Sequence, residues 1–343
     1  MGVSARRNTY FPRQMTGDLP DLIFSLKDTS SFSDAALRIF RFQAENNPVY
    51  RQFISSLRRI VSGIKNINDI PFIPAEFFKS QTVAIENQSF DTVFESRMTT
   101  GDTPGRHFVH DLKLYEKSFH SSFRYFYGDP SGYFIAALLP SYTGRQNSSL
   151  IYMMKELIKE SRSSDSGFYN DKPEELIRKI SLAKVSGQKR LLLGVSFALL
   201  DFANNYSPDL SGTMVMETGG MKGRRKEITR EELHEILKVK LNVQSVHSEY
   251  GMTELLSQAY SQGNGIFHCP PWMKILVRDP SDPLTVTDEQ GTSGGINIID
   301  LANIYSCSFI ATGDFGKLYK NGGFGVSGRF DNSDIRGCNL MAE

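Results

Sequence analysis

The chain has 343 residues and a formal net charge of +1, from 39 basic and 38 acidic residues, and 40% of its residues are hydrophobic. The balanced charge excludes a protein whose main task is broad attraction to nucleic acid or to an anionic membrane. No apolar run reaches the ~18 residues that a membrane-spanning helix needs. Three cysteines cannot build a disulfide framework, and no apolar run follows Arg6 and Arg7 as in a secretory signal. Both observations predict a cytoplasmic location.

Residues 1–90 have the pattern of helices. Apolar residues recur at helical spacing between Ala36 and Phe42, and Ser33 is a candidate N-cap for this helix. Asn47-Pro48 interrupts the pattern, and a second amphipathic segment continues as far as Ile64. We expect residues 1–90 to form a helical segment that packs on the core.

Residues 91–262 alternate between short apolar runs and helical stretches. Strands are predicted at 133–139, 190–197, 213–216 and 243–247. Helices are predicted at 149–161, from an Asp171 cap to Gly187, and after a capping box formed by Thr229-Arg-Glu-Glu232. This alternation predicts an α/β core with mixed sheets flanked by helices.

Residues 263–343 have the pattern of a smaller β-rich subdomain with a C-terminal tail. The candidate strands are separated by Gly, Asp and Pro turns; they are Phe267, 273–277, 296–299, 308–311 and 324–327. Cys269 and Cys307 belong to this part of the chain, and we expect both to be structural.

Five short motifs carry candidate chemistry. In chain order they are 99–107 (TTGDTPGRH), 217–225 (ETGGMKGRR), 248–254 (SEYGMTE), 311–314 (ATGD) and 328–331 (GRFD). Glycines and hydroxyls let a loop approach phosphate oxygens, and Arg106 or His107 adds a donor to the first motif. Paired glycines at the end of a strand let a planar ring or a phosphate approach the backbone. Each motif alone also suits a plain turn, a solvated basic loop or a helix start.

The later motifs add groups that suit a nucleotide bound to a metal ion. Thr253 is a donor for phosphate, Glu254 is a hard oxygen ligand for Mg²⁺, and Tyr250 is a ring that stacks on a base. Asp314 at a strand end accepts hydrogen bonds from both ribose hydroxyls, and Arg329 contacts ribose or phosphate.

Taken together, the order of the five motifs over residues 90–335 resembles the adenylate-forming ligase superfamily, which includes acyl-CoA synthetases and phenylacetate–CoA ligase. The resemblance implies the N-terminal region of that fold, with ATP and Mg²⁺ bound. It implies that Thr99, Thr100 and Gly101 contact the triphosphate and that Gly219, Gly220 and Tyr250 surround the adenine, with Gly251 also binding ATP. Thr253 then contacts the α-phosphate, Glu254 holds Mg²⁺, and Asp314 and Arg329 contact the ribose. Tyr142 resembles the aromatic residue beside the acyl substrate.

A narrower resemblance is to the acyl-protein synthetase branch of the luminescence fatty acid reductase complex. The matching segments are 109–112 (VHDL), 139–142 (LPSY), 194–197 (GVSF), 219–225 (GGMKGRR) and 335–338 (IRGC). This branch implies ATP-dependent activation of a fatty acid, transfer of the acyl group to Cys338, and an acyl reductase as partner. Arg336 stands two residues before Cys338, and a nearby cation lowers the pKa of a thiol.

Larger members of the superfamily carry a C-terminal lid domain whose lysine assists adenylation. Only 12 residues follow Asp331 here, too few for such a domain, so we expect the lid to be absent. One of Lys222, Arg224 and Arg225 is then expected to supply the missing cation. No nucleic-acid partner and no membrane insertion are expected.

Two alternatives remain open. One is an acyl- or aryl-CoA ligase that uses CoA as the thiol, although the expected absence of the lid argues against it. The other is a degenerate ligase that binds an acyl group or a partner protein. It arises because Arg97 and Met98 follow Ser96, where the superfamily loop has Ser or Thr and then Gly.

Overall fold

The computed structural model describes residues 19–26, 28–96, 103–140, 147–219 and 228–329. Its α-helices are α2 (Leu19–Phe24), α3 (Thr29–Asn46), α4 (Pro48–Ser56), α5 (Phe77–Ser80), α6 (Leu112–Tyr127), α7 (Ser149–Glu160), α8 (Pro173–Val185), α9 (Ser196–Tyr206) and α10 (Arg230–Leu241). No helix among these residues is long and apolar enough to cross a membrane.

The strands of the described residues form two six-stranded sheets and one hairpin. The hairpin pairs β2 (Thr92–Glu95) with β3 (Arg106–Val109). The first sheet contains β4 (Tyr133–Leu138), β5 (Gly167–Phe168), β6 (Lys189–Val195), β7 (Met214–Thr218), β8 (Val246–Tyr250) and β9 (Ala259–Ser261). The second contains β1 (Ile73–Pro74), β10 (Met273–Arg278), β11 (Val286–Thr287), β12 (Ser293–Asp300), β13 (Phe309–Leu318) and β14 (Phe324–Arg329).

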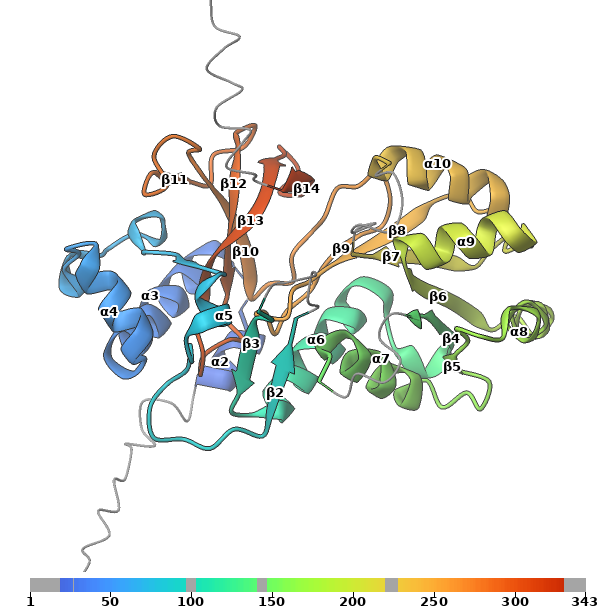
Figure 1. Cartoon of the computed structure of the whole chain (residues 1–343), viewed down its shortest axis with the longest axis horizontal. Helices are drawn as coiled ribbons and strands as arrows, with labels where there is room; N and C mark the ends of the chain where they lie inside the picture. Colours follow the sequence, from blue (N-terminus) through green and yellow to red (C-terminus); the bar gives the residue numbers. More distant parts are fainter. Residues whose placement is uncertain (1–18, 27, 97–102, 141–146, 220–227, 330–343) are drawn as a thin grey trace, which may run out of the picture.

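The first sheet is mostly parallel, with the strand order β5-β4-β6-β7-β8-β9, and only β9 runs antiparallel to its neighbour. Helices α9 and α10 cover one face, while α6 and α7 lie across the other (Figure 1). All six residues of β4 are buried, as expected for a parallel strand covered on both faces. The carboxyl ends of β4, β6, β7 and β8 therefore lie along one edge of this sheet.

The second sheet joins distant parts of the chain. Its strand order is β1-β13-β12-β10-β11, and β14 also pairs with β13, outside this order. β1 runs parallel to β13, so residues 73–74 pair with 310–311. Helices α3 and α4 lie beside this sheet, and α5 lies beneath it (Figure 1). The division at residues 90 and 262 stays a prediction.

Gln43 on α3 ties the first helices to the second sheet. Its side-chain amide donates to the backbone carbonyls of Asn303 (2.9 Å) and Ile304 (2.8 Å) and to the Ser308 hydroxyl (3.1 Å), and its oxygen accepts from the Ser308 amide (3.0 Å). Gln43 is fully buried. Each polar group of this side chain thus has a partner from residues 303–308, as burial requires.

Two predictions for the N-terminal helices were wrong. Asp28, and not Ser33, caps α3, because the Asp28 carboxylate accepts from the Ser31 amide at 2.8 Å and Ser31 completes a capping box. Ser33 lies inside the helix and donates to the Thr29 carbonyl. The second amphipathic segment ends as a helix at Ser56; Ile60 beyond it is 74% exposed and is not part of a helical face.

Predictions for the core were closer. The Thr229–Glu232 capping box opens α10, and Gly187 follows α8 as expected. Lys172, and not Asp171, occupies the N-cap position of α8 and makes no side-chain cap bond. The predicted strand at 190–197 ends at Val195, because the next two residues already belong to α9.

Candidate nucleotide site

Two of the five motifs follow neighbouring parallel strands. Gly219 comes directly after β7, and its φ of +67° lies in the left-handed region that favours glycine. Tyr250 is the last residue of β8, and Gly251 follows it. Because β7 and β8 are parallel and paired, both motifs lie at the same sheet edge, as ligand-binding loops do in open α/β sheets.

The fourth and fifth motifs meet the third at Tyr250. Asp314 of β13 and Arg329 of β14 are opposite each other in the antiparallel register. The Tyr250 hydroxyl donates to Asp314 Oδ2 at 2.7 Å. Burial, together with the Asp314 carboxylate, raises the pKa of Tyr250, so the phenol keeps its proton. Three predicted site residues, distant in sequence, are thus brought together between the two sheets.

Glu254 lies against the end of the first motif. A Cβ placed on Gly105 would stand only 2.7 Å from Oε1 of Glu254 and 3.3 Å from Oγ of Ser96. Gly105 therefore leaves the space that the Glu254 carboxylate occupies. The Gly105 amide also donates to the Ser96 hydroxyl at 2.8 Å.

His107 is buried and contacts the backbone of the third motif. We assign the ring proton to Nδ1, which donates to the Thr253 carbonyl oxygen at 2.8 Å. Burial lowers the pKa of His107 to about 4, so the ring is neutral at physiological pH. Of the two expected phosphate donors, Arg106 or His107, the ring of His107 is used inside the fold, where the residue is 1% exposed, whereas Arg106 is exposed and stays a prediction.

Asn303 and Asp300 hold the backbone around Glu254. The Asn303 side-chain amide donates to the Glu254 carbonyl at 2.8 Å, and Asp300 Oδ2 accepts from the backbone amides of Leu256 (2.7 Å) and Ser257 (3.0 Å). Asp300 is fully buried. The second sheet thus fixes the turn that follows β8 of the first sheet.

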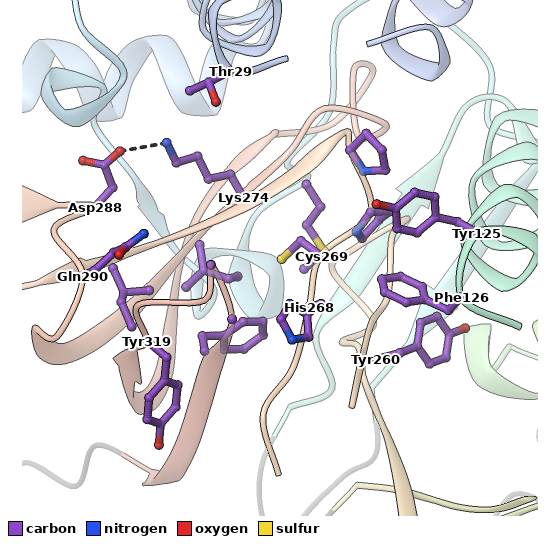
Figure 2. Close-up of a pocket in the computed structure, with 18 of the residues that line it drawn as sticks. Thr29, Tyr125, Phe126, Tyr260, His268, Cys269, Lys274, Asp288, Gln290 and Tyr319 are labelled. Atoms are coloured by element: carbon purple, nitrogen blue, oxygen red, sulfur yellow. Dashed lines mark hydrogen bonds and ion pairs between the residues drawn. The ribbon is translucent and has the colours of Figure 1, made fainter. Parts of the chain in front are cut away.

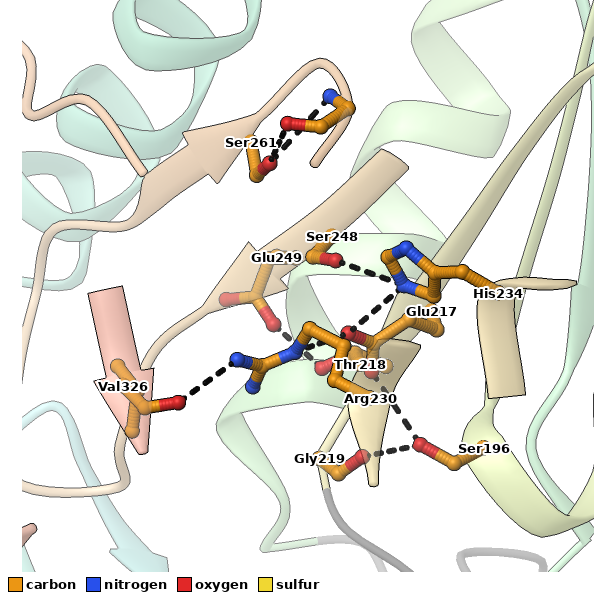
Figure 3. A network of polar contacts seen from close by, with 11 residues as sticks. Ser196, Glu217, Thr218, Gly219, Arg230, His234, Ser248, Glu249, Ser261 and Val326 are labelled. Atoms are coloured by element: carbon orange, nitrogen blue, oxygen red, sulfur yellow. Dashed lines mark hydrogen bonds and ion pairs between the residues drawn. The ribbon is translucent and has the colours of Figure 1, made fainter. Parts of the chain in front are cut away.

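Two buried glutamates occupy adjacent strand ends (Figure 3). Burial alone would raise the pKa of Glu217, but the His234 ring, whose Nε2 lies 3.7 Å from Oε1, and the charge of Arg230 outweigh it and lower that pKa. Among the described residues, the neutral Thr218 hydroxyl donates to Glu249. Burial and, to a lesser extent, the Glu217 charge together raise the pKa of Glu249 to about 7, against the effect of this hydroxyl.

Three residues near the site were not predicted to matter. Arg278 donates to the Thr312 carbonyl at 2.6 Å, beside the Thr-Gly-Asp motif, and Arg230 is the ion partner of Glu217 at 3.0 Å. Glu249 stood inside a motif but had no role. One signal for these residues is present in the sequence, which is the apolar strand predicted at 273–277. That signal places Arg278 at a strand end but does not indicate its partner.

The remaining predicted residues lie outside the described part of the chain, and their roles stay predictions. They are Arg97, Met98, Thr99, Thr100, Gly101, Tyr142, Gly220, Lys222, Arg224, Arg225 and Cys338.

The two cysteines within the described residues lie outside the strands, Cys269 before β10 and Cys307 before β13. Cys307 is fully buried, and burial raises the pKa of its thiol to about 12. Burial also raises the pKa of the half-buried Cys269, and the Asp300 charge adds to this effect. Both thiols are therefore held in the unreactive neutral form.

A pocket of about 620 Å³ lies elsewhere (Figure 2). Aromatic side chains including Tyr125, Phe126 and His268 line it, and the Lys274–Asp288 ion pair (2.8 Å) crosses one wall. None of the predicted site residues that the structure describes lines this pocket. We therefore do not assign the nucleotide to it.

The donor set suits Mg²⁺ carried by a nucleotide rather than a resident metal. No group of three His, Cys, Asp or Glu residues that could hold a metal ion occurs among the described residues. Mg²⁺ in nucleotide sites usually takes one or two carboxylates, with water and phosphate oxygens completing the shell. The Glu254 carboxylate fits that smaller requirement.

Comparison with known proteins found similarity only at the level of structure. No protein-family model and no curated protein matches the chain. The luciferase-like enzyme of the nonluminescent mealworm Zophobas morio matches with a TM-score of 0.52 at 15% identity, over 72% of this chain and 59% of that one. A long-chain-fatty-acid-CoA ligase of Archaeoglobus fulgidus matches with a TM-score of 0.50 at 15% identity, over 73% and 53%.

The chain shares its mixed α/β fold with these two proteins. This confirms the predicted fold class. The chain spans between half and three-fifths of the length of these two proteins. At 15% identity the likeness concerns the fold alone, and the acyl-protein synthetase branch stays a prediction.

Proposed function

We propose that this protein uses ATP to convert a carboxylic acid into an acyl-adenylate and then passes the acyl group to a thiol. The observation that supports this most is the meeting of Tyr250, Asp314 and Arg329 between the two sheets. The sequence assigns adenosine contacts to these three residues, and the ligase-like fold is an independent second support.

On the adenosine side, the Asp314 carboxylate accepts hydrogen bonds from the ribose hydroxyls in this proposal. The carboxylate is already oriented by the Tyr250 hydroxyl, which donates to Oδ2 at 2.7 Å. Arg329 is exposed and stands opposite Asp314, where its charge reaches ribose or phosphate oxygens. No described atom lies within 4 Å of a Cβ placed on Gly219, so its backbone is open to the adenine ring, whereas a Cβ on Gly251 would stand 2.5 Å from Oε1 of Glu249.

On the phosphate side, Thr253 donates to the α-phosphate and Glu254 holds Mg²⁺. When bound, Mg²⁺ offsets phosphate charge during transfer. Thr99, Thr100 and Gly101 are assigned to the triphosphate, and one of Lys222, Arg224 and Arg225 to the charge that develops. Catalysis then rests on positioning and charge neutralisation.

The chemistry has two steps. A carboxylate oxygen of the acid attacks the α-phosphorus, the bond to the bridging oxygen breaks, and pyrophosphate leaves. A thiolate then attacks the acyl carbon, forms a thioester and expels AMP. The adenylate must be kept from water between these steps.

For the acceptor we propose Cys338, with a fatty acid as substrate beside Tyr142 and an acyl reductase as the protein that takes up the product. CoA is the alternative acceptor. The narrower sequence resemblance supports Cys338.

The first test measures pyrophosphate release from ATP and Mg²⁺ with a panel of carboxylic acids. We expect release that depends on one class of acid. Asp314→Ala should raise the KM for ATP by about tenfold or more, because hydrogen bonds to a charged group contribute about 1.5–3 kcal/mol. Asp171→Asn, a change at an exposed position, is the control. If ATP binds but no acid yields pyrophosphate, the degenerate alternative is correct.

The second test identifies the acceptor. Intact mass after incubation with ATP and the active acid should show an acyl-sized gain that hydroxylamine removes and that Cys338→Ala abolishes. A gain that survives in Cys338→Ala would contradict the self-acylation step. Pyrophosphate release that needs CoA would favour the CoA-ligase alternative.

A further inference from the structure

Arg230, the first residue of α10, bonds to strands of both sheets. Its Nε donates to Oε1 of Glu217 at 3.0 Å, next to the end of β7. Its Nη1 donates to the backbone carbonyl of Val326 on β14 at 3.1 Å. Figure 3 shows the guanidinium between these two partners. One planar side chain thus bridges two strands that are otherwise on separate sheets.

The same guanidinium rests on the aromatic layer below Tyr250. Its Cζ is 5.1 Å from the centroid of the Phe267 ring, within the range of a cation–π contact. Phe267 stacks on Phe324 with centroids 5.4 Å apart, and the Tyr250 ring contacts both at 5.8 and 5.6 Å. Arg230 therefore packs against the rings on which a predicted adenine contact also rests.

Glu217 passes this restraint to the glycine loop. The Ser196 hydroxyl lies 3.2 Å from Glu217 Oε2 and also contacts the Gly219 carbonyl. The side chain of Glu217 is 4% exposed and that of Arg230 is 27% exposed, so the ion pair is largely shielded from solvent. Glu217 stands two residues before Gly219, and Val326 stands three before Arg329.

We propose that Arg230 is a positioning residue that sets the spacing between the two walls of the nucleotide site. One wall is the Gly219 end of β7, and the other is the Asp314–Arg329 pair of β13 and β14. The inference rests on the proposed function for its nucleotide. An arginine suits this role because its fixed fork donates in two directions at once, whereas lysine is a single point of charge.

The role differs from that of an ion pair that only stabilises the fold. Removing an ion pair of that kind would lower the unfolding temperature without changing the ATP affinity of the folded protein. Removing a residue that sets the spacing would also raise the KM for ATP, while the rate at saturating ATP stays near that of the parent.

The variants separate charge from geometry. Arg230→Lys keeps a cation beside Glu217 but loses the fork. The single variant Arg230→Gln would leave the buried Glu217 carboxylate unpaired and could fail to fold for that reason alone. The double variant Arg230→Gln with Glu217→Gln removes both charges and avoids this problem. Lys238→Gln, which removes an exposed ion pair with Glu235 on the same helix, is the matched control.

Two measurements on the full chain test the proposal. Calorimetry and pyrophosphate kinetics should show an ATP Kd and KM raised about tenfold in Arg230→Lys and in the double variant, with kcat changed less than threefold; tenfold corresponds to about 1.4 kcal/mol. Hydrogen exchange without nucleotide should be faster in residues 324–329 of both. Lys238→Gln should match the parent in both measurements.

The outcomes are distinguishable. Unchanged ATP affinity and unchanged exchange of β14 in a folded Arg230→Lys protein would overturn the inference. If the parent protein binds no ATP, the proposed function fails and the spacing of an ATP site fails with it. If the parent binds ATP but releases no pyrophosphate, the affinity and exchange measurements still decide the role of Arg230.

Discussion

Glu249 is the residue at which burial and charge conflict most. It is 7% exposed, and the Thr218 hydroxyl is the donor to its Oε2. The groups that face it from neighbouring elements are Glu217 of β7, Tyr115 and Tyr127 of α6 and Tyr260 of β9, none of which carries a positive charge. Among the described residues, burial and the Glu217 charge outweigh the Thr218 hydroxyl, so they favour the neutral acid in the fold.

Glu249→Gln should therefore change how stability depends on pH. With its pKa raised to about 7 in the fold, Glu249 retains a proton that the unfolded chain has released, so the free energy of unfolding falls as pH rises from about 4.5 to 7. The amide resembles the neutral acid and removes this loss, on the order of 3 kcal/mol. Urea unfolding at pH 5 and pH 8 should show the variant gaining relative to the parent.

The exposed Glu289 provides the control for this effect. Glu289→Gln should leave the pH dependence of stability as in the parent. Equal slopes for Glu249→Gln and the parent would mean that Glu249 is ionised in the fold throughout this range.

Helix α10 depends on its first turn, which also holds Arg230. The Thr229 hydroxyl accepts from the Glu232 amide at 3.1 Å, and the Glu232 carboxylate accepts from the Thr229 amide at 2.9 Å. These bonds satisfy two of the amides that a helix start leaves without partners. The cap therefore also fixes the place from which Arg230 extends.

Thr229→Ala should lower the free energy of unfolding by about 1 kcal/mol, the usual contribution of an N-cap side chain. Chemical unfolding measures this directly. Ser33→Ala is the control, because Ser33 lies inside α3 and alanine has the higher helix propensity, so little or no loss is expected. A loss in Ser33→Ala as large as in Thr229→Ala would contradict the assignment of the caps.

Elements with strong local signals were predictable, and those set by tertiary context were not. The apolar run of β4 and the capping box of α10 need no distant partner to be recognised. The apolar run of β6 continues into residues 196–197, so hydrophobic periodicity does not show where β6 ends and α9 begins. The hairpin of β2 and β3 was also missed, because half-exposed short strands resemble loops.

The site was predictable as a set of motifs but not as a set of contacts. The order of motifs named Tyr250, Asp314 and Arg329, and the register of β13 with β14 then placed two of them opposite each other. The sequence carried no sign that His107 turns inward. Nor did it indicate that Arg230 bonds to a carbonyl 96 residues away, since backbone acceptors leave no trace in sequence.

At the scale of the whole molecule, the two sheets share one continuous apolar core, and α3 joins it through a polar anchor. Gln43 satisfies two backbone carbonyls, one hydroxyl and one amide of residues 303–308. All of these groups are buried with it. Removing the anchor therefore leaves several polar groups without partners or water.

Gln43→Leu should lower the free energy of unfolding by about 3 kcal/mol or more, because each buried polar group left unpaired costs about 1–3 kcal/mol. Urea unfolding followed by circular dichroism measures the loss. Gln52→Leu, at an exposed position of α4, is the control and should stay within about 0.5 kcal/mol of the parent. A loss below 1 kcal/mol would mean that water replaces the anchor.

The anchor also has a consequence for a chain emerging from the ribosome. The partners of Gln43 lie about 260 positions further along the chain. At about 5–20 residues per second, α3 waits roughly 10–50 s for them. Residues 133–261 complete the first sheet within that time, since its strands pair with near neighbours. The part of the apolar face of α3 that packs on the second sheet has no partner until then, so we expect the newly made N-terminal helices to need protection from aggregation during translation.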